Sequence, residues 1–197
     1  MCAPAKRHAG FSLTELVVAL AVALILMAVG LPAFMRAYRA YQLNSVATQV
    51  ADILRLTRYE AIRLNTPIQC VIKPSVSDPG YTDAWVDSNK NLALDATEKM
   101  ILLGPAGSLV DVGSVPGASS LSTLAVGSFA VDPATPSGYA VQFDARGAVV
   151  TPANKVVVFY LSSTLAPEAG YRAVFLMPAG SIQIWTGDGA GNWQQQR

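Results

Sequence analysis

Residues 9–34 read AGFSLTELVVALAVALILMAVGLPAF, a long apolar run with one carboxylate, Glu15, near its start. The part from Leu16 to Phe34 has about the length of a helix that spans a bilayer. A charge near the centre of such a helix costs roughly 2.5–3.5 kcal/mol, which makes Glu15 a candidate functional residue. Pro32 lacks a backbone N–H and predicts a kink in the helix.

A short polar leader with Lys6 and Arg7 precedes the apolar run and ends at Gly10. In a secretory signal peptide the apolar core is shorter and the cleavage site follows it. Here the expected cleavage position precedes the apolar run, so the span would be retained. The alternative is an ordinary signal anchor, and the carboxylate inside the span argues against it.

Beyond Pro32, apolar residues recur at i, i+3, i+4 and i+7, as on one face of an amphipathic helix. Asn65 and Pro67 mark the end of that pattern. The sequence therefore predicts one helix from Phe11 to Leu64, whose second half packs against a globular domain. The predicted buried stripe comprises Leu43, Val46, Ala47, Val50, Ile53, Leu54, Thr57, Ala61 and Leu64.

After Pro67 the pattern changes to short alternating runs between turn residues, which is typical of strands. The Gly- and Ser-rich stretch from Gly104 to Ser122 is predicted to be a long loop. The predicted fold class is α+β, with a long N-terminal helix packed on an antiparallel β-sheet domain. Strands are predicted at 68–73, 82–87, 99–103, 109–112, 128–131, 139–143, 148–150, 156–161, 171–177 and 181–186.

The composition is 52 % hydrophobic and 14 % charged, and the apolar excess comes largely from the first 35 residues. Residues 40–197 carry 10 Lys and Arg against 12 Asp and Glu, so they lack the basic surplus that drives binding to a phosphate backbone. Of the two cysteines, Cys2 lies in the leader. Cys70 stands in an apolar alternation and is predicted to be a small core residue.

Catalysis finds no support in the sequence. The single histidine, His8, lies in the leader, and no other residue offers an obvious base at neutral pH. The sequence has no G-x-S-x-G, no phosphate-binding glycine loop and no Cys/His cluster with metal-ligand spacing. We therefore expect a protein that is not an enzyme.

Residues 10–16, GFSLTEL, followed by the apolar run and Pro32, resemble the N-terminal signature of type IV pilins and type II secretion pseudopilins. The resemblance implies that a prepilin peptidase cleaves between Gly10 and Phe11 and N-methylates Phe11. It also divides the chain into four parts. These are a cleaved leader (1–10), a transmembrane and assembly helix (11–34), an amphipathic helix (35–65) and a periplasmic β-rich domain (66–197).

Glu15 acquires a specific role from this resemblance. A filament of bundled apolar helices would bury its carboxylate, and a buried charge needs a partner. In such filaments the implied partner is the terminal amine of a neighbouring subunit, here that of Phe11. The alternative is a glutamate at the level of the lipid headgroups, where water solvates it.

Residues 54–68, LRLTRYEAIRLNTPI, resemble the helix end and first strand of the GspH/FimT family of pseudopilins. Residues 143–147 and 180–185 also stand where that family has a turn and a terminal hairpin. DNA-binding members carry Gly-Arg-x-Arg in that hairpin, whereas this chain has GSIQ at 180–183. The missing arginines and the acidic balance imply that no nucleic acid is bound.

Residues 87–98, DSNKNLALDATE, place oxygen-bearing side chains at positions 1, 3, 5, 9 and 12 of an EF-hand-like pattern. Position 6, which is Gly in that pattern, is Leu92, and the flanking segments are predicted strands instead of helices. Two interpretations stay open: a calcium-binding loop, or a solvated hairpin loop rich in Asp and Asn. The calcium candidates are Asp87, Asn89, Asn91, Asp95 and Glu98.

Together, the resemblances imply a minor pseudopilin of a type II secretion system, the H type. Such a protein sits in the bacterial inner membrane with a periplasmic C-terminal domain. Its partners are other pilins or pseudopilins, bound through the N-terminal helix, and the prepilin peptidase. The nearest alternative is a minor pilin of a type IV pilus. Two further alternatives are a DNA-binding module on a pilus and a membrane-anchored hydrolase.

Overall fold

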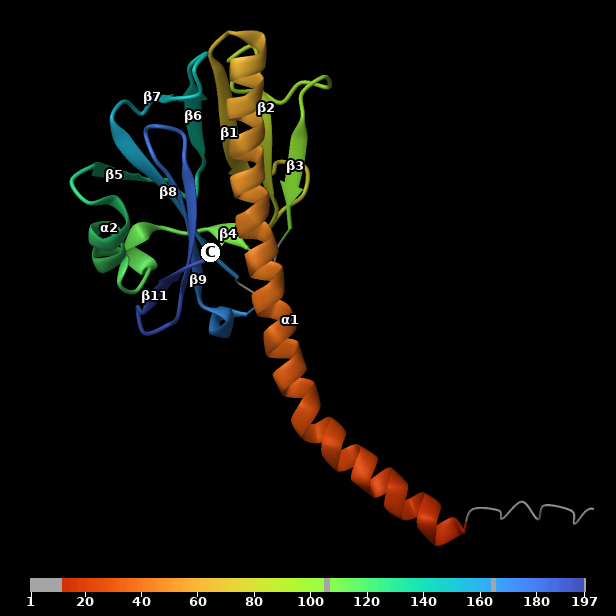
Figure 1. The fold of residues 1–197 in the computed structure, drawn as a ribbon. Coiled ribbons are helices and arrows are strands. Elements are labelled where there is room, and N and C mark those ends of the chain that lie inside the picture. The colour runs from red at the N-terminus through yellow and green to blue at the C-terminus, as the bar shows by residue number, and fades with distance from the viewer. Residues whose placement is uncertain (1–11, 105–106, 164–165, 197) are drawn as a thin grey trace, which may run out of the picture. The chain divides into compact units, whose positions relative to one another are not determined.

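The computed structural model describes residues 12–104, 107–163 and 166–196. The chain divides into two units, Met1–Ala37 and Tyr38–Arg197. Helix α1 (Leu13–Leu64) begins in the first unit and ends in the second, which also holds all strands of the described residues (Figure 1). The long helix and the sheets confirm the predicted α+β class.

In the first unit, the described part of α1 is apolar and exposed around its whole surface. Among the described residues, α1 alone is long and apolar enough to cross a membrane, judged by its length and by a mean hydropathy of 2.7 over an 18-residue stretch within it. Pro32 lies inside the continuous helix, and the guanidinium of Arg36 donates to the Pro32 carbonyl at 3.4 Å. The kink at Pro32 stays a prediction.

In the second unit, one face of α1 is buried, as its periodicity predicts. The stripe residues that are buried are Leu43, Val46, Ala47, Val50, Ile53, Leu54, Thr57 and Ala61. Leu64, the last residue of the helix, is 48 % exposed instead. Asn65 follows in the left-handed conformation with φ 50°. The N–H of Thr66 donates to the carbonyl of Ala61, which completes a Schellman-type end to the helix.

The first sheet has five strands in the order β3-β2-β1-β6-β7, and all neighbouring strands are antiparallel. Strands β3 and β7 are therefore its edges. Ile68, Cys70 and Ile72 alternate along β1 and point into the core that α1 covers. The strands are β1 (Ile68–Pro74), β2 (Thr82–Asp87), β3 (Met100–Leu103), β6 (Tyr139–Phe143) and β7 (Val149–Thr151).

The second sheet has the order β11-β10-β9-β8-β4, and β5 also pairs with β8. The β5–β8 pair is parallel, which departs from the purely antiparallel sheet that the sequence predicts. One edge of β8 is thus shared between β4 and β5, because each covers a different part of its length. The strands are β4 (Ser108–Leu109), β5 (Ala130–Pro133), β8 (Lys155–Ser162), β9 (Tyr171–Leu176), β10 (Ile182–Gly187) and β11 (Trp193–Gln195).

Two clusters of buried side chains hold the second unit together. The larger one joins α1 to both sheets and includes Val157 and Phe159 of β8. The smaller one lies on the other face of the second sheet, where Leu121 of helix α2 (Ala118–Val126) packs against Tyr160 and Phe175. Strands β8 and β9 are consequently buried on both faces.

Two elements contradict the sequence-based expectations. Helix α2 occupies part of the stretch for which the sequence predicts a loop, and β11 lies where the sequence predicts no strand. Two short 3₁₀ turns, Val112–Ser114 and Pro167–Ala169, also interrupt the connecting segments.

Cys70 is a buried residue of the larger cluster, which confirms its predicted place in the core. Burial raises the pKa of its thiol to about 12, although a hydrogen bond with Thr57 opposes the shift. The thiol is therefore protonated at neutral pH and sits among apolar side chains.

Arg58 of α1 joins one turn of each sheet. Its Nε donates to the carbonyl of Gly147, in the β6–β7 turn, at 3.0 Å. Its Nη1 donates to the carbonyl of Gly180, in the β9–β10 turn, at 3.1 Å. Both glycines have positive φ, and a Cβ on Gly180 would lie 2.4 Å from the Gly147 oxygen. We call these three residues the Arg58 clamp.

We predict that Gly180→Ala lowers the free energy of unfolding by about 2–4 kcal/mol, because the new methyl group meets backbone and the φ is unfavourable for alanine. Gly189→Ala is the matched control, since a methyl group at that position would have no atom within 4 Å and its φ is unremarkable. It should change stability by less than about 0.5 kcal/mol. Urea unfolding of the full chain in detergent measures both, and equal losses would contradict the clamp.

Candidate functional site

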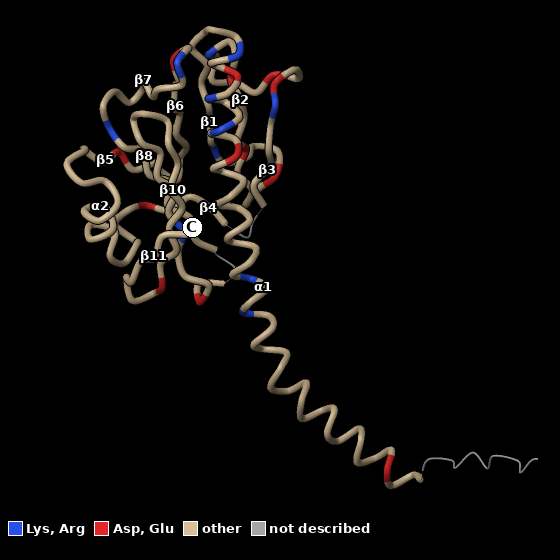
Figure 2. Tube along the Cα trace, viewed as in Figure 1, with Lys and Arg blue, Asp and Glu red and all other residues tan. Residues whose placement is uncertain are grey.

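The first candidate site is the start of α1, where Glu15 occupies the first helical turn. Its side chain is exposed, and it is the single charged residue between Ser12 and Met35 (Figure 2). A carboxylate at this position interacts favourably with the positive end of the helix dipole. Gly10 and Phe11, the predicted cleavage and methylation positions, lie outside the described residues, so the processing site stays a prediction.

The described first unit therefore presents an apolar helical surface with one carboxylate at its end. Exposure of such a surface to water is unfavourable. Lipid or other apolar helices would cover it. In either environment the carboxylate needs a cation or water. The pairing of Glu15 with a neighbouring subunit stays a prediction.

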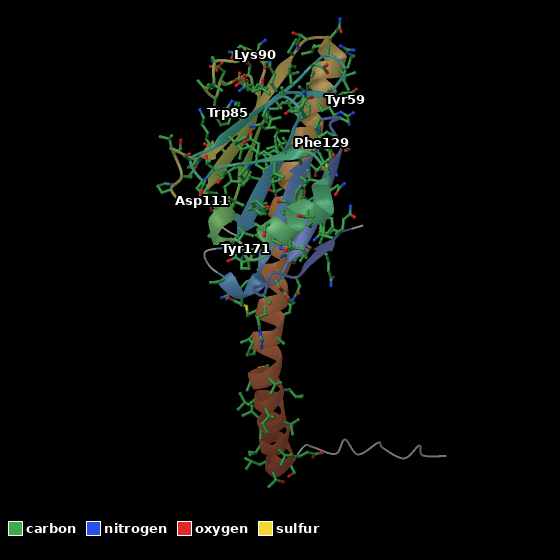
Figure 3. All side chains as sticks on the ribbon, turned by 90° about the vertical axis from the view of Figure 1, so that its left-hand side faces the viewer. Tyr59, Trp85, Lys90, Asp111, Phe129 and Tyr171 are labelled. Carbon is green, nitrogen blue, oxygen red and sulfur yellow. The ribbon has the colours of Figure 1, made fainter. Side chains whose placement is uncertain are left out.

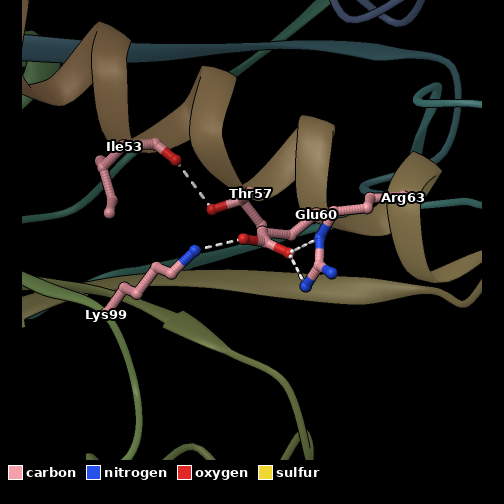
Figure 4. Close-up of polar contacts among 5 residues, drawn as sticks. All are labelled: Ile53, Thr57, Glu60, Arg63 and Lys99. Carbon is pink, nitrogen blue, oxygen red and sulfur yellow. Dashed lines mark hydrogen bonds and ion pairs between the residues drawn. The ribbon is translucent and has the colours of Figure 1, made fainter.

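The second candidate is the motif at residues 54–68, where the buried Glu60 forms a charge cluster with Arg63 and Lys99, whose side chains are exposed (Figure 4). The Glu60 side chain is only 8 % exposed. Its Oε2 accepts from Arg63 Nε at 2.8 Å, and its Oε1 is bound by the ammonium of Lys99. One helical turn earlier, the Thr57 hydroxyl donates to the Ile53 carbonyl at 2.8 Å.

The cluster gives a structural role to Glu60 and Arg63 of the motif. Hydrogen bonds from Lys99 and Arg63 hold the pKa of the Glu60 carboxyl below its usual value of 4.5, although burial opposes this. Sequence spacing identifies the Glu60–Arg63 pair, but it misses Lys99, which stands just before β3. Glu60 thereby ties the end of α1 to the edge of the first sheet, while Arg58 ties it to the turns of both sheets.

The third candidate is the loop 87–98. Asp87 is fully buried, and its carboxylate accepts hydrogen bonds from the backbone N–H groups of Lys90, Asn91 and Leu92 at 2.6–3.3 Å. The Asp95 carboxylate accepts from the side-chain amides of Asn89 and Asn91. Four of the five predicted calcium candidates are thus brought together within one loop.

The fifth candidate, Glu98, closes the same loop by accepting from the N–H groups of Ser88 and Asp95. Leu92 adopts φ 60°, so the sharp turn that usually calls for glycine forms here with leucine. Lys73 donates to the Leu92 carbonyl and lies over the Trp85 ring at 5.9 Å from its centroid. Figure 3 shows Trp85 and Lys90 on the same side of the unit.

Within the described ranges, no group of three or more His, Cys, Asp or Glu side chains is arranged to hold a metal ion. The oxygens that would bind calcium are instead used in hydrogen bonds within the loop. Both sequence-based interpretations of the loop therefore stay open, and calcium binding stays a prediction.

The hairpin that carries the arginine pair in DNA-binding relatives begins here with Gly180, whose carbonyl accepts from Arg58. Ser181 precedes β10, and Gln183 lies within that strand. Figure 2 shows basic and acidic positions interspersed over the second unit. The prediction that the protein binds no nucleic acid rests on these residues and on the acidic balance, and it stays a prediction.

Two protein-family models match the sequence of this chain. The model of the family described as type II transport protein GspH matches residues 46–180, which is more than half of the chain. The chain belongs to the GspH family. The model of the prokaryotic N-terminal methylation motif matches residues 5–31, which include the second half of the leader, Glu15 and most of the apolar run. As a GspH-family chain with this motif, the protein is a minor pseudopilin or pilin.

Solved structures similar to this GspH-family chain include two crystal forms of the type IV minor pilin FimU of Pseudomonas aeruginosa (strain PAO1). The first match has 17 % sequence identity and a TM-score of 0.44, and it covers 78 % of this chain and 98 % of that chain. The second has 17 % identity and a TM-score of 0.43, covering 79 % and 95 %. No curated protein matched the sequence. The family assignment rests on the matched family models.

We predict that Glu60→Gln lowers the free energy of unfolding by about 1–2 kcal/mol at pH 7, because two charge-assisted hydrogen bonds are weakened. The folded pKa of Glu60 is depressed, so this contribution is present above pH 4.5 and is lost as the pH falls through the folded pKa. The difference between wild type and variant should therefore shrink in acid. Asp52→Asn, at an exposed pair with Arg55, is the control.

Denaturant unfolding measured from pH 7 to pH 3 tests this expectation. A difference between wild type and Glu60→Gln that stays constant over that range would contradict it. Asp144 and Asp188 also have lowered pKa values, through hydrogen bonds in their turns. They contribute to acid sensitivity in both proteins and cancel in the comparison.

We predict that Asp87→Ala destabilises the protein by about 2–3 kcal/mol even in the presence of a chelator, because three N–H groups lose a buried acceptor. Asp87→Asn keeps one carbonyl acceptor and should lose less stability than Asp87→Ala. Melting temperatures are measured with EDTA and with added calcium. A calcium-dependent rise that Asp87→Ala abolishes would decide for the calcium loop, and identical values would decide for the hydrogen-bonded hairpin loop.

Proposed function

We propose that this protein is a minor pseudopilin of a type II secretion system. The observation that carries the proposal is the GspH match over residues 46–180, which covers most of the second unit. In this role the protein joins a short periplasmic filament that moves folded proteins through a channel in the outer membrane. Its contribution is mechanical, and it needs no catalytic residues.

Membrane insertion and processing are part of the proposal. The apolar half of α1 anchors the chain in the bacterial inner membrane, with the leader in the cytoplasm and the second unit in the periplasm. The prepilin peptidase removes residues 1–10 and methylates the new amino group of Phe11. The match of the methylation motif to residues 5–31 supports this sequence of events.

Assembly then uses the exposed apolar surface of α1. In a bundle of such helices, packing of side chains is the main attraction, and a single buried charge pair fixes the register. Glu15 is the single carboxylate available on this surface. Its partner is the methylated amine of the neighbouring subunit. A helix shifted by one turn would leave both charges unpaired, which disfavours wrong registers.

The alternative is a minor pilin of a type IV pilus, which shares the same N-terminal segment and the same kind of sheet domain. The missing arginines at 181 and 183 argue only against the branch that binds DNA. The two candidates differ in the filament that they build, so a cellular measurement separates them.

The test is deletion of the gene in its own host, followed by assays of protein secretion and of surface pili. We expect extracellular enzymes to accumulate in the periplasm while pilus number stays normal. Loss of pili with normal secretion would instead establish the pilus candidate. Intact mass of the complementing wild-type protein reports cleavage after Gly10.

Glu15→Ala is introduced in the same complementation experiment, with Thr14→Ala as the matched control. We expect Glu15→Ala to insert in the membrane at a normal level but to reduce incorporation into filaments by at least about tenfold, as for the loss of a desolvated charge pair. Recovery of the variant in sheared filaments at the wild-type level would remove the pairing argument.

A further inference from the structure

Strand β3 leaves one side of the first sheet open (Figure 1). It pairs with β2 from Trp85↔Met100 to Thr82↔Leu103. One residue earlier, the N–H of Val86 donates to the carbonyl of Lys99 at 3.0 Å. Bonded and non-bonded pairs alternate in an antiparallel ladder, so Met100 and Leu102 point their N–H and C=O groups away from β2. These groups face the open side.

Edge strands are often protected by a charge, a proline or a bulge that prevents another strand from pairing. The four residues of β3 contain none of these features. The four residues of β3 are Met, Ile, Leu and Leu, and Met100 and Leu102 are 45 % and 39 % exposed. At the opposite edge, β7 is followed at once by Pro152, and its pairing with β6 contains a register shift.

Two hollows lie beside β3. The first, of about 230 Å³, lies between β3 and α1 and is lined by Tyr41, Gln49 and Leu102, among others. The second, of about 410 Å³, lies on the side of the 87–98 loop and is lined by Leu94, Asp95, Ala96, Glu98 and Met100. Met100 and Leu102 are two residues apart, so their side chains share one face of the sheet. A strand added to this edge would place every second side chain on that face, beside these two residues.

The second hollow has a negative charge that is not neutralised. Asp95 and Glu98 accept hydrogen bonds from neutral amides, but neither belongs to an ion pair among the described residues. Beside them stand the exposed apolar side chains of Leu94 and Met100. This combination complements a segment that carries apolar residues and a lysine or arginine.

We propose that β3 is a docking site for an extended segment of another protein chain, which adds to the first sheet as a sixth strand. The backbone of the segment bonds to Met100 and Leu102. Its apolar side chains cover Leu94 and Met100, and its basic residue lies against Asp95 and Glu98. The proposal does not depend on which kind of filament the protein joins.

The test uses the full chain in phosphatidylcholine nanodiscs and a synthetic probe, the blocked hexapeptide Lys-Val-Thr-Val-Thr-Val. Amide hydrogen exchange is followed at single residues. We expect saturating peptide to slow exchange about tenfold at Met100 and Leu102, whose N–H groups become bonded. Exchange at Ile101 and Leu103 should not change, because these residues already bond to β2. A peptide with N-methylated backbone is the control and should not bind.

Two variants make the test specific. Leu102→Pro removes the outward N–H without removing a bond to β2, so it should keep its melting temperature and weaken peptide binding about tenfold. Leu102→Ala retains the N–H and is the matched control. Replacing the lysine of the peptide with glutamate should also weaken binding about tenfold, because it meets two carboxylates.

Several results would overturn the proposal. One is the absence of binding, and another is binding that leaves exchange at Met100 and Leu102 unchanged. Equal affinity of wild type and Leu102→Pro would show that the backbone edge is not used. Protection of Met100 and Leu102 that rises with protein concentration, without peptide, would assign the edge to a second copy of this chain.

Discussion

The second half of α1 supplies a shared core to two sheets that no described strand links to each other. Its buried side chains belong to one cluster with side chains of β1, β2 and β6 of the first sheet and β8 and β9 of the second. Fully burying one such aliphatic side chain stabilises the fold by about 1.5–3 kcal/mol. The helix stripe therefore joins the two sheets into one unit through a shared core.

Polar contacts fix how the helix sits in that core. Near one end, Arg172 of β9 is 3 % exposed and donates to the Asn44 side chain and to the carbonyls of Ala169 and Tyr171. Near the other end, Arg58 reaches the turns of both sheets, and Glu60 binds Lys99. Apolar packing alone would tolerate some sliding of a helix on a sheet. Buried charges whose partners are far apart in the sequence penalise it, because a shifted helix would leave them without partners.

The sequence was informative where periodicity is strong. Except for Leu64, the buried stripe of α1 follows from spacing, as do the bounds of β2 and β6, and the end of α1 at Leu64 follows from the stop signal at Asn65 and Pro67. Helix α2 was missed because its sequence, ASSLSTLAV, is short and serine-rich and lies between glycines. Leu121 stabilises it through tertiary packing that no local pattern reveals. The polar strand β11 is not predicted either, because no local pattern reveals the tertiary contacts that stabilise it.

The sites show the same division between local and long-range information. Glu60 and Arg63 are neighbours by helical spacing, whereas Lys99 joins them from 39 residues away. The hydrogen bonds of Arg58 to Gly147 and Gly180 span 89 and 122 residues. A family motif marks such residues, but only the fold shows that they hold the helix to the sheets. Gly10 and Phe11, the predicted processing positions, come from a motif and lie outside the described residues.

Cys70 has a consequence for how the protein tolerates its surroundings. Burial raises the pKa of its thiol to about 12, so the thiol stays protonated at neutral pH, and it is out of reach of solvent. Oxidants and thiol–disulfide exchange act on the thiolate, so the Cys70 thiol is unreactive toward both in the folded protein. The described fold relies on no disulfide. A chain built in this way keeps the same core whether it is made in a reducing compartment or works in an oxidising one.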